Sequence, residues 1–312
     1  MKKHITIEVD ISAYLLKRGP GNLVRGIHDI LPYKTKYCNF IPSKAIYPSK
    51  EKRDFNLYFI PVPKFNESIY NEWINIKQVN KLILGPCFVP TKWKLFPKKN
   101  VWKERYFSEI LKQVKGIAIH SERVRNHLSK RSNTINMLNK YKIIRPCTNL
   151  KPKYIKPFIK RNIDILFFEK YMDQDHSRQG AQIIHLFGAA SKKIKRLKYG
   201  SYTKEKMEYL ANNTKFIIYF SFFDTGAIGL KEIQNYGVYT FSHQRDLIIH
   251  NDTGLYVPEL ADNKNMSQAY KIIMEKIEIV LKSSHNTLSI AKINQEINKC
   301  QNALNDLCEN LL

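Results

Sequence analysis

Acidic residues are scarce in this chain of 312 residues, which has 27 aspartates and glutamates against 52 lysines and arginines. The formal net charge of +25 favours an anionic partner: a nucleic acid, an acidic membrane surface or a phosphorylated small molecule. Charge alone does not choose among these classes, because dispersed lysines are also what an ordinary solvated surface carries.

Cysteines and long apolar runs are also scarce. The five cysteines are odd in number and widely scattered, with no C-x-x-C pair and no histidine spacing typical of a zinc site. This pattern favours a reduced, cytoplasmic compartment. No apolar stretch reaches the roughly 18 residues that a membrane span needs. The start of the chain, "MKKHITIEVDIS", alternates like a strand and lacks the apolar core of a signal peptide.

Apolar runs of strand length recur along the chain, with amphipathic segments between them. They are bounded by Gly, Pro, Asn or Ser, which is typical of buried parallel strands in α/β domains. The first series lies at 4–12, 36–43, 55–63, 80–90 and 116–121, and the second at 162–170, 192–202, 214–221, 237–242 and 254–259. Between the two series, residues 144–160 carry three prolines and many lysines, which is the composition of a linker.

The predicted fold class is therefore α/β with two Rossmann-like domains. We expect an N-terminal domain at 1–150, a linker at 151–161 and a C-terminal domain at 162–265. Residues 266–312 have apolar side chains at spacings of three and four, which predicts amphipathic helices that pack back on the domains.

The segment "FFDTGAIGLKEIQNYG" places two acids around two glycines directly after the apolar run at 214–221. Asp224 and Glu232 are separated by seven residues, so with a helix that begins near Thr225 both acids can face one cleft. The amides of Gly226 and Ala227 would then offer an anion site at the carboxyl edge of a parallel sheet. The alternative is an ordinary β–α turn, in which Asp224 or Thr225 caps the helix and the glycines permit close packing.

An acid, seven residues and a second acid after a strand resemble the signature of retaining GT-B glycosyltransferases, in particular glycosyltransferase family 4, also called glycosyl transferases group 1. The resemblance implies two parallel sheets that face each other across a cleft. It also implies that Asp224 acts as a catalytic residue at the donor sugar. Thr225, Gly226 and Ala227 would bind its diphosphate, and Glu232 its ribose. This chain has Asp224 where the family usually has Glu.

Further segments are similar to the same family. "NYGVYTFSHQRDLIIHNDTGLYVPE" has Gly237, Gly254 and Pro258 where the family has a helix end, a strand and a closing loop. "DILFFEKYMDQDHSRQG" stands where the family has a strand followed by a basic pair. The resemblance implies that Lys170, as a catalytic residue, and Arg178 neutralise the donor diphosphate, which would stabilise the leaving group.

Two more groups of residues follow from the resemblance. Tyr199, Gly200 and Tyr202 would approach the nucleotide base, although tyrosines beside a helix start are as often packing residues. Gly19 and Gly21, in "YLLKRGPGNLVRGIHDIL", are similar to the glycine-rich loop that the family places near the donor phosphates. Taken alone, G-P-G is a common turn.

The resemblance predicts a hexosyl- or pentosyltransferase that moves a sugar from a nucleotide-diphosphate sugar to a glycan, glycoprotein or lipid-linked acceptor. We expect a retaining reaction without a metal or another cofactor, because helix dipole and cations can carry the charge. The acidic triplet at 173–175 is expected to be a solvated loop rather than a metal site. No general base is assigned, since a histidine at a strand end, such as His120, is more often structural.

Two alternatives remain open. A nucleic-acid-binding protein without catalytic activity would use the basic segments at 92–106 and 191–198, in the first of which aromatic residues alternate with lysines. That reading leaves the spacing of Asp224 and Glu232 unexplained. Peripheral attachment to an acidic membrane surface is compatible with the enzyme, because many sugar acceptors are linked to lipids.

Overall fold

The computed structural model divides the chain into two compact units. The first comprises Met1–Asn149, Phe223–Ile228 and Glu296–Leu312, and the second Leu150–Phe222 and Gly229–Gln295. The structure describes residues 6–10, 19–30, 34–38, 57–60, 79–87, 111–126, 141–144, 152–170, 174–190, 192–221, 226–248, 253–283 and 290–310.

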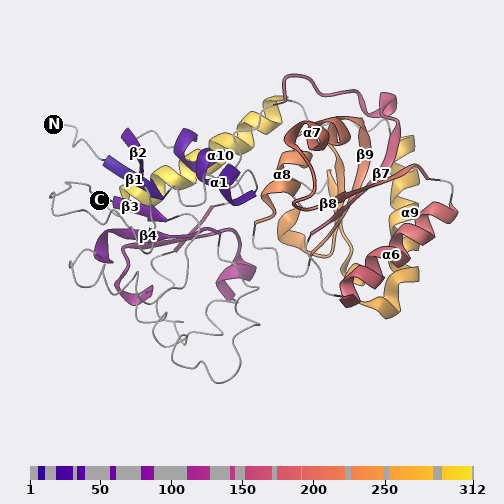
Figure 1. Ribbon diagram of the computed structural model, residues 1–312, viewed down its shortest axis with the longest axis horizontal. Coiled ribbons are helices and arrows are strands. Elements are labelled where there is room, and N and C mark those ends of the chain that lie inside the picture. The colour runs from indigo at the N-terminus through magenta and orange to yellow at the C-terminus, as the bar shows by residue number, and fades with distance from the viewer. Residues whose placement is uncertain are drawn as a thin grey trace. The chain divides into compact units, whose positions relative to one another are not determined.

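The first unit is built on a six-stranded parallel sheet with the order β2-β1-β3-β4-β5-β6 (Figure 1). Four of the five apolar runs of the first series contain a strand, as predicted, and the run at 36–43 overlaps only the end of β2. The described elements are β1 (Thr6–Asp10), α1 (Gly19–Ile30), β2 (Lys34–Cys38), β3 (Leu57–Ile60), β4 (Leu82–Leu84), β5 (Gly116–Ile119) and β6 (Tyr141–Ile143). The sequence did not predict β6, because it is a short, half-buried edge strand with a lysine at its centre.

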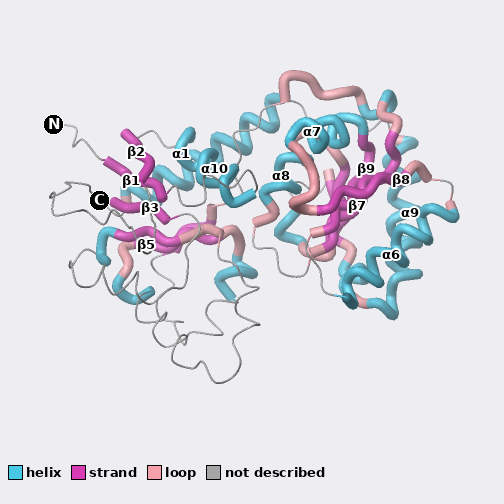
Figure 2. Tube along the Cα trace, in the orientation of Figure 1, coloured by secondary structure: helices cyan, strands magenta, loops and turns pink. Residues whose placement is uncertain are grey.

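The second unit is built on a five-stranded parallel sheet with the order β11-β10-β9-β7-β8 (Figure 2). Each apolar run of the second series again forms a strand. The strands are β7 (Ile163–Glu169), β8 (Ile194–Lys198), β9 (Thr214–Phe220), β10 (Tyr239–Ser242) and β11 (Gly254–Tyr256). The helices are α6 (Gln174–Ala189), α7 (Lys204–Asn213), α8 (Ile228–Gln234) and α9 (Met266–Lys282).

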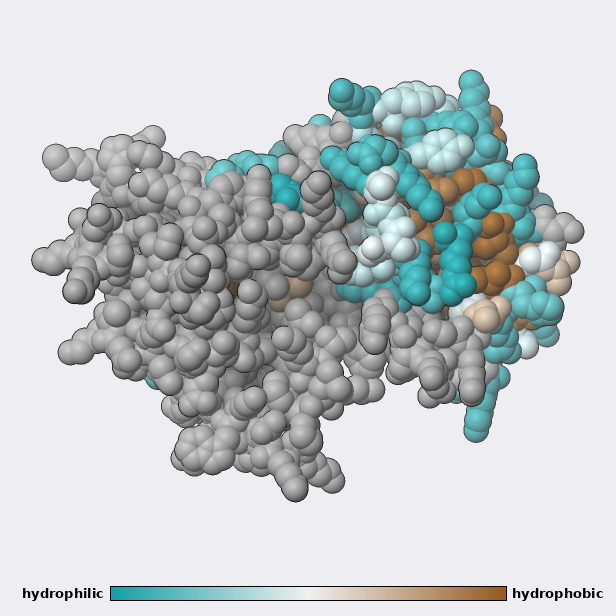
Figure 3. All heavy atoms as spheres, viewed as in Figure 1, coloured by the Kyte–Doolittle hydropathy of each residue, from teal (hydrophilic) through white to brown (hydrophobic). Residues whose placement is uncertain are grey.

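The central strands β7, β9 and β10 are buried on both faces, as parallel strands between helices are, whereas the edge strand β8 is largely exposed. Ile165 and Phe167 of β7 belong to a core cluster with apolar side chains of α6 and α9. Phe168, on the opposite face of β7, contacts the rings of Tyr202 and of Tyr219 from β9. On the face in view in Figure 3, this unit shows mostly hydrophilic residues with apolar ones between them.

Arg161 lies just before β7 and is one of the largest fully buried side chains, with 2% of its surface exposed. Its guanidinium donates hydrogen bonds to the carbonyl oxygens of Thr214 at 2.7 Å, Tyr236 at 2.6 Å, Lys156 at 3.0 Å and Gly237 at 3.4 Å. Burial lowers the pKa of this guanidinium to about 10. A side chain from the predicted linker therefore binds the start of β9 and the backbone that follows α8.

The last described helix, α10 (Ile290–Glu309), is amphipathic as predicted. Leu304 and Cys308 are buried, and burial raises the pKa of the Cys308 thiol to about 12. Within the first unit, the Lys142 ammonium lies 3.1 Å from a carboxylate oxygen of Asp306. Among the described helices, none combines the length and the apolar composition needed to cross a membrane.

Candidate functional site

The carboxyl edge of the second sheet brings together residues that follow β7 and β8. The amide N–H of Tyr199 donates to the carbonyl oxygen of Glu169 at 2.8 Å, so the ends of the two strands are joined. Lys170 follows Glu169 directly, and its ammonium lies 5.3 Å from the centre of the Tyr199 ring. A cation and an aromatic ring predicted to bind the donor are therefore neighbours in the structure.

Glu169, the acid beside Lys170, forms an ion pair with a different cation, Arg196. Glu169 is buried, and its Oε2 accepts hydrogen bonds from Nε of Arg196 at 2.6 Å and Nη2 at 2.5 Å. Arg196 reaches it from β8, the neighbouring strand. Because Arg196 compensates this buried carboxylate, the charge balance at the strand end does not depend on Lys170.

Tyr202 lies between β7 and α8. Its ring contacts Phe168 edge-on, with centroids 6.0 Å apart, and a Cβ on Gly229 would lie 3.2 Å from its hydroxyl. Burial raises the pKa of this phenol, and the negative charges of Glu232 and Tyr199 raise it further. The structure thus places the Tyr202 hydroxyl against the first turn of α8, which is the packing role left open by the sequence.

Glu232 is a buried acid on α8, with 6% of its surface exposed. Gly229 and Glu232 are three residues apart on α8, so they share one face of the helix, and Tyr236 lies in the turn that follows it. Burial raises the pKa of Tyr236 to about 12, with Glu208 and Glu232 contributing. Glu232 is therefore a buried acid whose negative charge acts on both Tyr202 and Tyr236. A buried hydrogen-bond acceptor acts more strongly than one in water.

The helix that carries Glu232 begins at Ile228, so the prediction that it begins near Thr225 was wrong. Gly226 and Ala227 precede the helix, and Gly226 packs against His120 in the first unit. A Cβ on Gly226 would lie only 1.9 Å from Cδ2 of that ring. This close approach requires a glycine, and glycine is a poor helix former, which agrees with a helix that begins only after it.

His120 follows β5 and is buried. Its Nδ1 lies 2.8 Å from the carbonyl oxygen of Ile144, so this nitrogen carries the proton and donates it. Ile144 comes directly after β6, and the bond therefore joins the ends of two neighbouring strands. This geometry agrees with the structural role expected for a histidine at a strand end.

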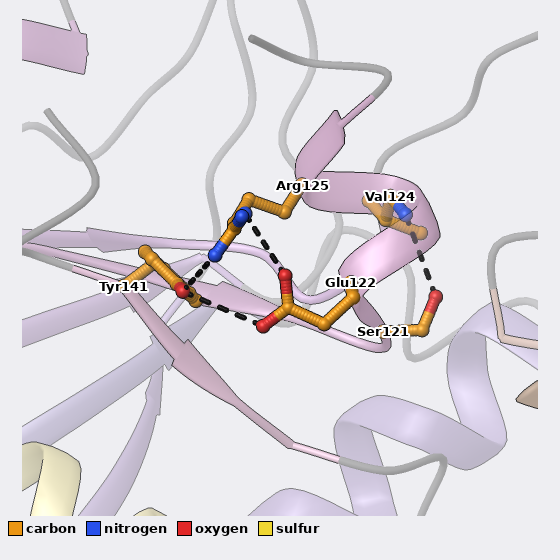
Figure 4. Close-up of polar contacts among 5 residues, drawn as sticks. All are labelled: Ser121, Glu122, Val124, Arg125 and Tyr141. Carbon is orange, nitrogen blue, oxygen red and sulfur yellow. Dashed lines mark hydrogen bonds and ion pairs between the residues drawn. The ribbon is translucent and has the colours of Figure 1, made fainter. Parts of the chain in front are cut away.

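A charged network follows His120 in the chain (Figure 4). The guanidinium of Arg125 donates to the Tyr141 hydroxyl at 2.6 Å and pairs with the Glu122 carboxylate at 2.9 Å. The Tyr141 hydroxyl in turn donates to Glu122 at 3.4 Å, and Ser121 Oγ accepts from the amide of Val124 at 3.4 Å. The bond to Tyr141 is the main cause that raises the pKa of Arg125. The network ties the helical segment at 122–126 to β6.

Two buried glutamines that the sequence analysis did not single out lie in the second unit. Gln244, which follows β10, donates from Nε2 to the carbonyl oxygen of Ser221 at 2.6 Å. Gln234, the last residue of α8, donates from Nε2 to the carbonyl oxygen of Leu247 at 2.8 Å. Because they are neutral and belong to no charge pattern, only the fold reveals them.

The remaining predicted residues are placed as follows. Gly19 and Gly21 lie in the first turn of α1, and Gly200 occupies the turn after β8 with φ of 81°, a conformation that favours glycine. Arg178 lies in α6, but its side chain is not among those described. Asp224 and Thr225 lie outside the described residues. Among the described residues, no group of three His, Cys, Asp or Glu side chains is arranged to hold a metal ion.

Two parallel α/β sheets, each in its own unit, make this a GT-B-like fold of two Rossmann-like domains, as predicted. The chain is similar to a sucrose-phosphate synthase from Thermosynechococcus elongatus, with a TM-score of 0.59, 10% identity and coverage of 97% of this chain and 94% of that one. It is also similar to an α-glucosyltransferase in complex with UDP, with a TM-score of 0.53, 9% identity and coverage of 96% and 95%. No protein family model and no curated protein sequence matches the chain.

Proposed function

We propose that this protein is a glycosyltransferase that takes its sugar from a nucleotide-diphosphate sugar. The observation that carries the proposal is the cluster at the carboxyl edge of the second sheet, where open α/β sheets bind their ligands. Lys170 and Tyr199 lie side by side there, and Tyr202 reaches the helix that carries Glu232. The GT-B-like fold supports it, since one similar structure is an α-glucosyltransferase with UDP.

Each residue of the cluster can bind one part of a nucleotide-diphosphate sugar. In this proposal the Lys170 ammonium stabilises the diphosphate as it leaves, because its charge grows in the transition state. Glu232, a buried acceptor, binds the ribose hydroxyls, and Tyr199 packs against the base. Asp224 contacts the sugar, and the amides of Gly226 and Ala227 bind phosphate.

The finer features of the reaction belong to the same proposal. It is a retaining, metal-independent hexosyl- or pentosyl transfer of the kind found in glycosyltransferase family 4, and the leaving diphosphate helps to deprotonate the acceptor. The acceptor is a glycan, a glycoprotein or a lipid-linked sugar, and the net charge of +25 suits association with an acidic membrane surface in the cytoplasm.

The fold gives no support to a nucleic-acid-binding protein without catalytic activity. The basic segment at 191–198 contains β8, an edge strand of the second sheet. Exposed lysines on an edge strand prevent pairing with other chains, which explains this charge without a polyanionic partner.

The test is calorimetric titration of the protein with UDP, GDP and their sugars. We expect one nucleotide series to bind and Glu232→Ala to abolish that binding. Glu296→Ala is the matched control, because Glu296 is an equally buried acid on α10. A screen for release of nucleoside diphosphate from nucleotide sugars then identifies the donor. Binding of oligonucleotides with a steep salt dependence, and of no nucleotide, would refute the proposal.

A further inference from the structure

Gln244 is positioned at the carboxyl edge of the second sheet, two residues after the end of β10. Only 6% of its surface is exposed. Its own amide N–H donates to Ser242 Oγ at 3.1 Å, and its side-chain Nε2 donates to the carbonyl oxygen of Ser221 at 2.6 Å. Ser221 ends the β9 run and stands three residues before Asp224 in the sequence. Gln244 thus holds the strand end from which the predicted donor-binding turn departs.

The side-chain oxygen of Gln244, Oε1, has no hydrogen-bond partner among the described residues. Oε1 of Gln244 is shielded from solvent and accepts no hydrogen bond from the residues that the structure describes. A buried acceptor in this state is costly, and natural proteins keep few of them outside functional positions. Its Nε2, by contrast, makes a short bond, so the amide orientation is fixed and Oε1 faces away from Ser221.

The chemistry of Oε1 limits what it can bind. A neutral amide oxygen accepts from a hydroxyl or an N–H group. It repels phosphate and carboxylate oxygens, which carry no proton at neutral pH. On a nucleotide-sugar donor, the groups that suit Oε1 are therefore hydroxyls of the sugar or ribose and N–H groups of the base, and not the diphosphate.

We propose that Gln244 is a specificity-determining residue whose Oε1 accepts a hydrogen bond from a hydroxyl of the transferred sugar. This inference rests on the proposed function, and it adds a neutral acceptor to the acid Asp224 at the sugar end of the site. The Nε2 bond to Ser221 orients the amide before the sugar binds, so little ordering is required on binding.

The test compares Gln244→Met with Gln234→Met in the full chain. Methionine has nearly the length and volume of glutamine but lacks the amide. Gln234 is the matched control because it is also buried and also donates Nε2 to a backbone carbonyl, that of Leu247 at 2.8 Å. For each variant, calorimetry gives the affinity for the nucleoside diphosphate and for the nucleotide sugar, and urea denaturation gives the stability.

For Gln244→Met we expect the affinity for the nucleotide sugar to fall about tenfold or more while that for the nucleoside diphosphate changes less than about twofold, because one hydrogen bond in a dry site is lost. Gln234→Met should lower the stability without changing the affinity for the nucleotide sugar more than that for the nucleoside diphosphate. Equal losses for both ligands, or no loss, would overturn the assignment of Oε1 to the sugar. If the wild type binds no nucleotide, the proposed function fails as well, and this outcome is seen before any variant is made.

Discussion

Gly226→Ala tests the close approach between Gly226 and His120. The new Cβ would lie 1.9 Å from Cδ2, 2.2 Å from Nε2 and 2.7 Å from Cγ of the imidazole. Carbon atoms in contact are about 3.5–4.0 Å apart, so the ring and the backbone have to separate by roughly 1.5 Å or more.

The ring cannot move without loss. His120 is buried, and a shift of that size breaks its 2.8 Å hydrogen bond to the carbonyl oxygen of Ile144. Overpacking costs about 1–3 kcal/mol and the lost bond about 0.5–1.5 kcal/mol. We therefore expect Gly226→Ala to lower the free energy of unfolding by about 2–4 kcal/mol, measured by urea denaturation.

A double variant that combines Gly226→Ala with His120→Ala shows whether the imidazole causes the loss of stability. With His120→Ala, the atoms that Gly226→Ala would meet are gone, so the same substitution should then cost less than about 1 kcal/mol. Gly188→Ala is the control, because nothing lies within 4 Å of its Cβ and alanine suits α6 better than glycine. An unchanged stability, or an equal cost in both backgrounds, would refute the reasoning.

Three more predictions concern the second unit. Arg161→Met leaves four carbonyl oxygens without their buried donor and should lower the free energy of unfolding by at least about 3 kcal/mol. Arg161→Lys should lower it less. A loss below about 1 kcal/mol for Arg161→Met would contradict this prediction. Partial burial opposes ionisation of Asp164, but the Lys193 amide and the Lys215 ammonium outweigh it and lower the pKa. The stability from Asp164 is thus present above its unfolded pKa of about 3.9 and is lost as the pH falls through the lower folded value. Asp164→Asn should flatten the acid limb of the urea-measured stability profile, and identical profiles would exclude the effect. Gly254→Ala puts a Cβ 2.8 Å from a backbone oxygen of β10 and should lower the melting temperature clearly more than Gly188→Ala does.

The strands were predictable because parallel strands buried on both faces leave continuous apolar runs in the sequence. β6 lacked such a run, since its central lysine is half-exposed and pairs with Asp306 far along the chain. The start of α8 was misplaced for a similar reason. The side chain that Gly226 meets, His120, lies more than 100 residues away in sequence, where no local pattern records the contact.

The candidate site was predictable only in part. Lys170 and Tyr199 directly follow β7 and β8, and the order of a parallel sheet places such residues at one edge. Glu232 was predicted from its spacing to Asp224 on the helix after β9. The pairing of Glu169 with Arg196 depends on the register of β7 and β8, which residue spacing does not reveal. Arg161 looked like one more cation in a proline-rich linker, because its partners are backbone carbonyls and carry no sequence signal.

The bonds of Arg161 also define where the second unit begins as a folding unit. A shortened chain that starts at Ile163 would keep all five strands of the second sheet. It would lack the guanidinium that binds the carbonyls after α8, and with it the anchor of the helix that bears Glu232. A shortened chain that keeps all four of these hydrogen bonds therefore has to include Lys156, whose own carbonyl completes the set, and cannot start at the first residue of the sheet.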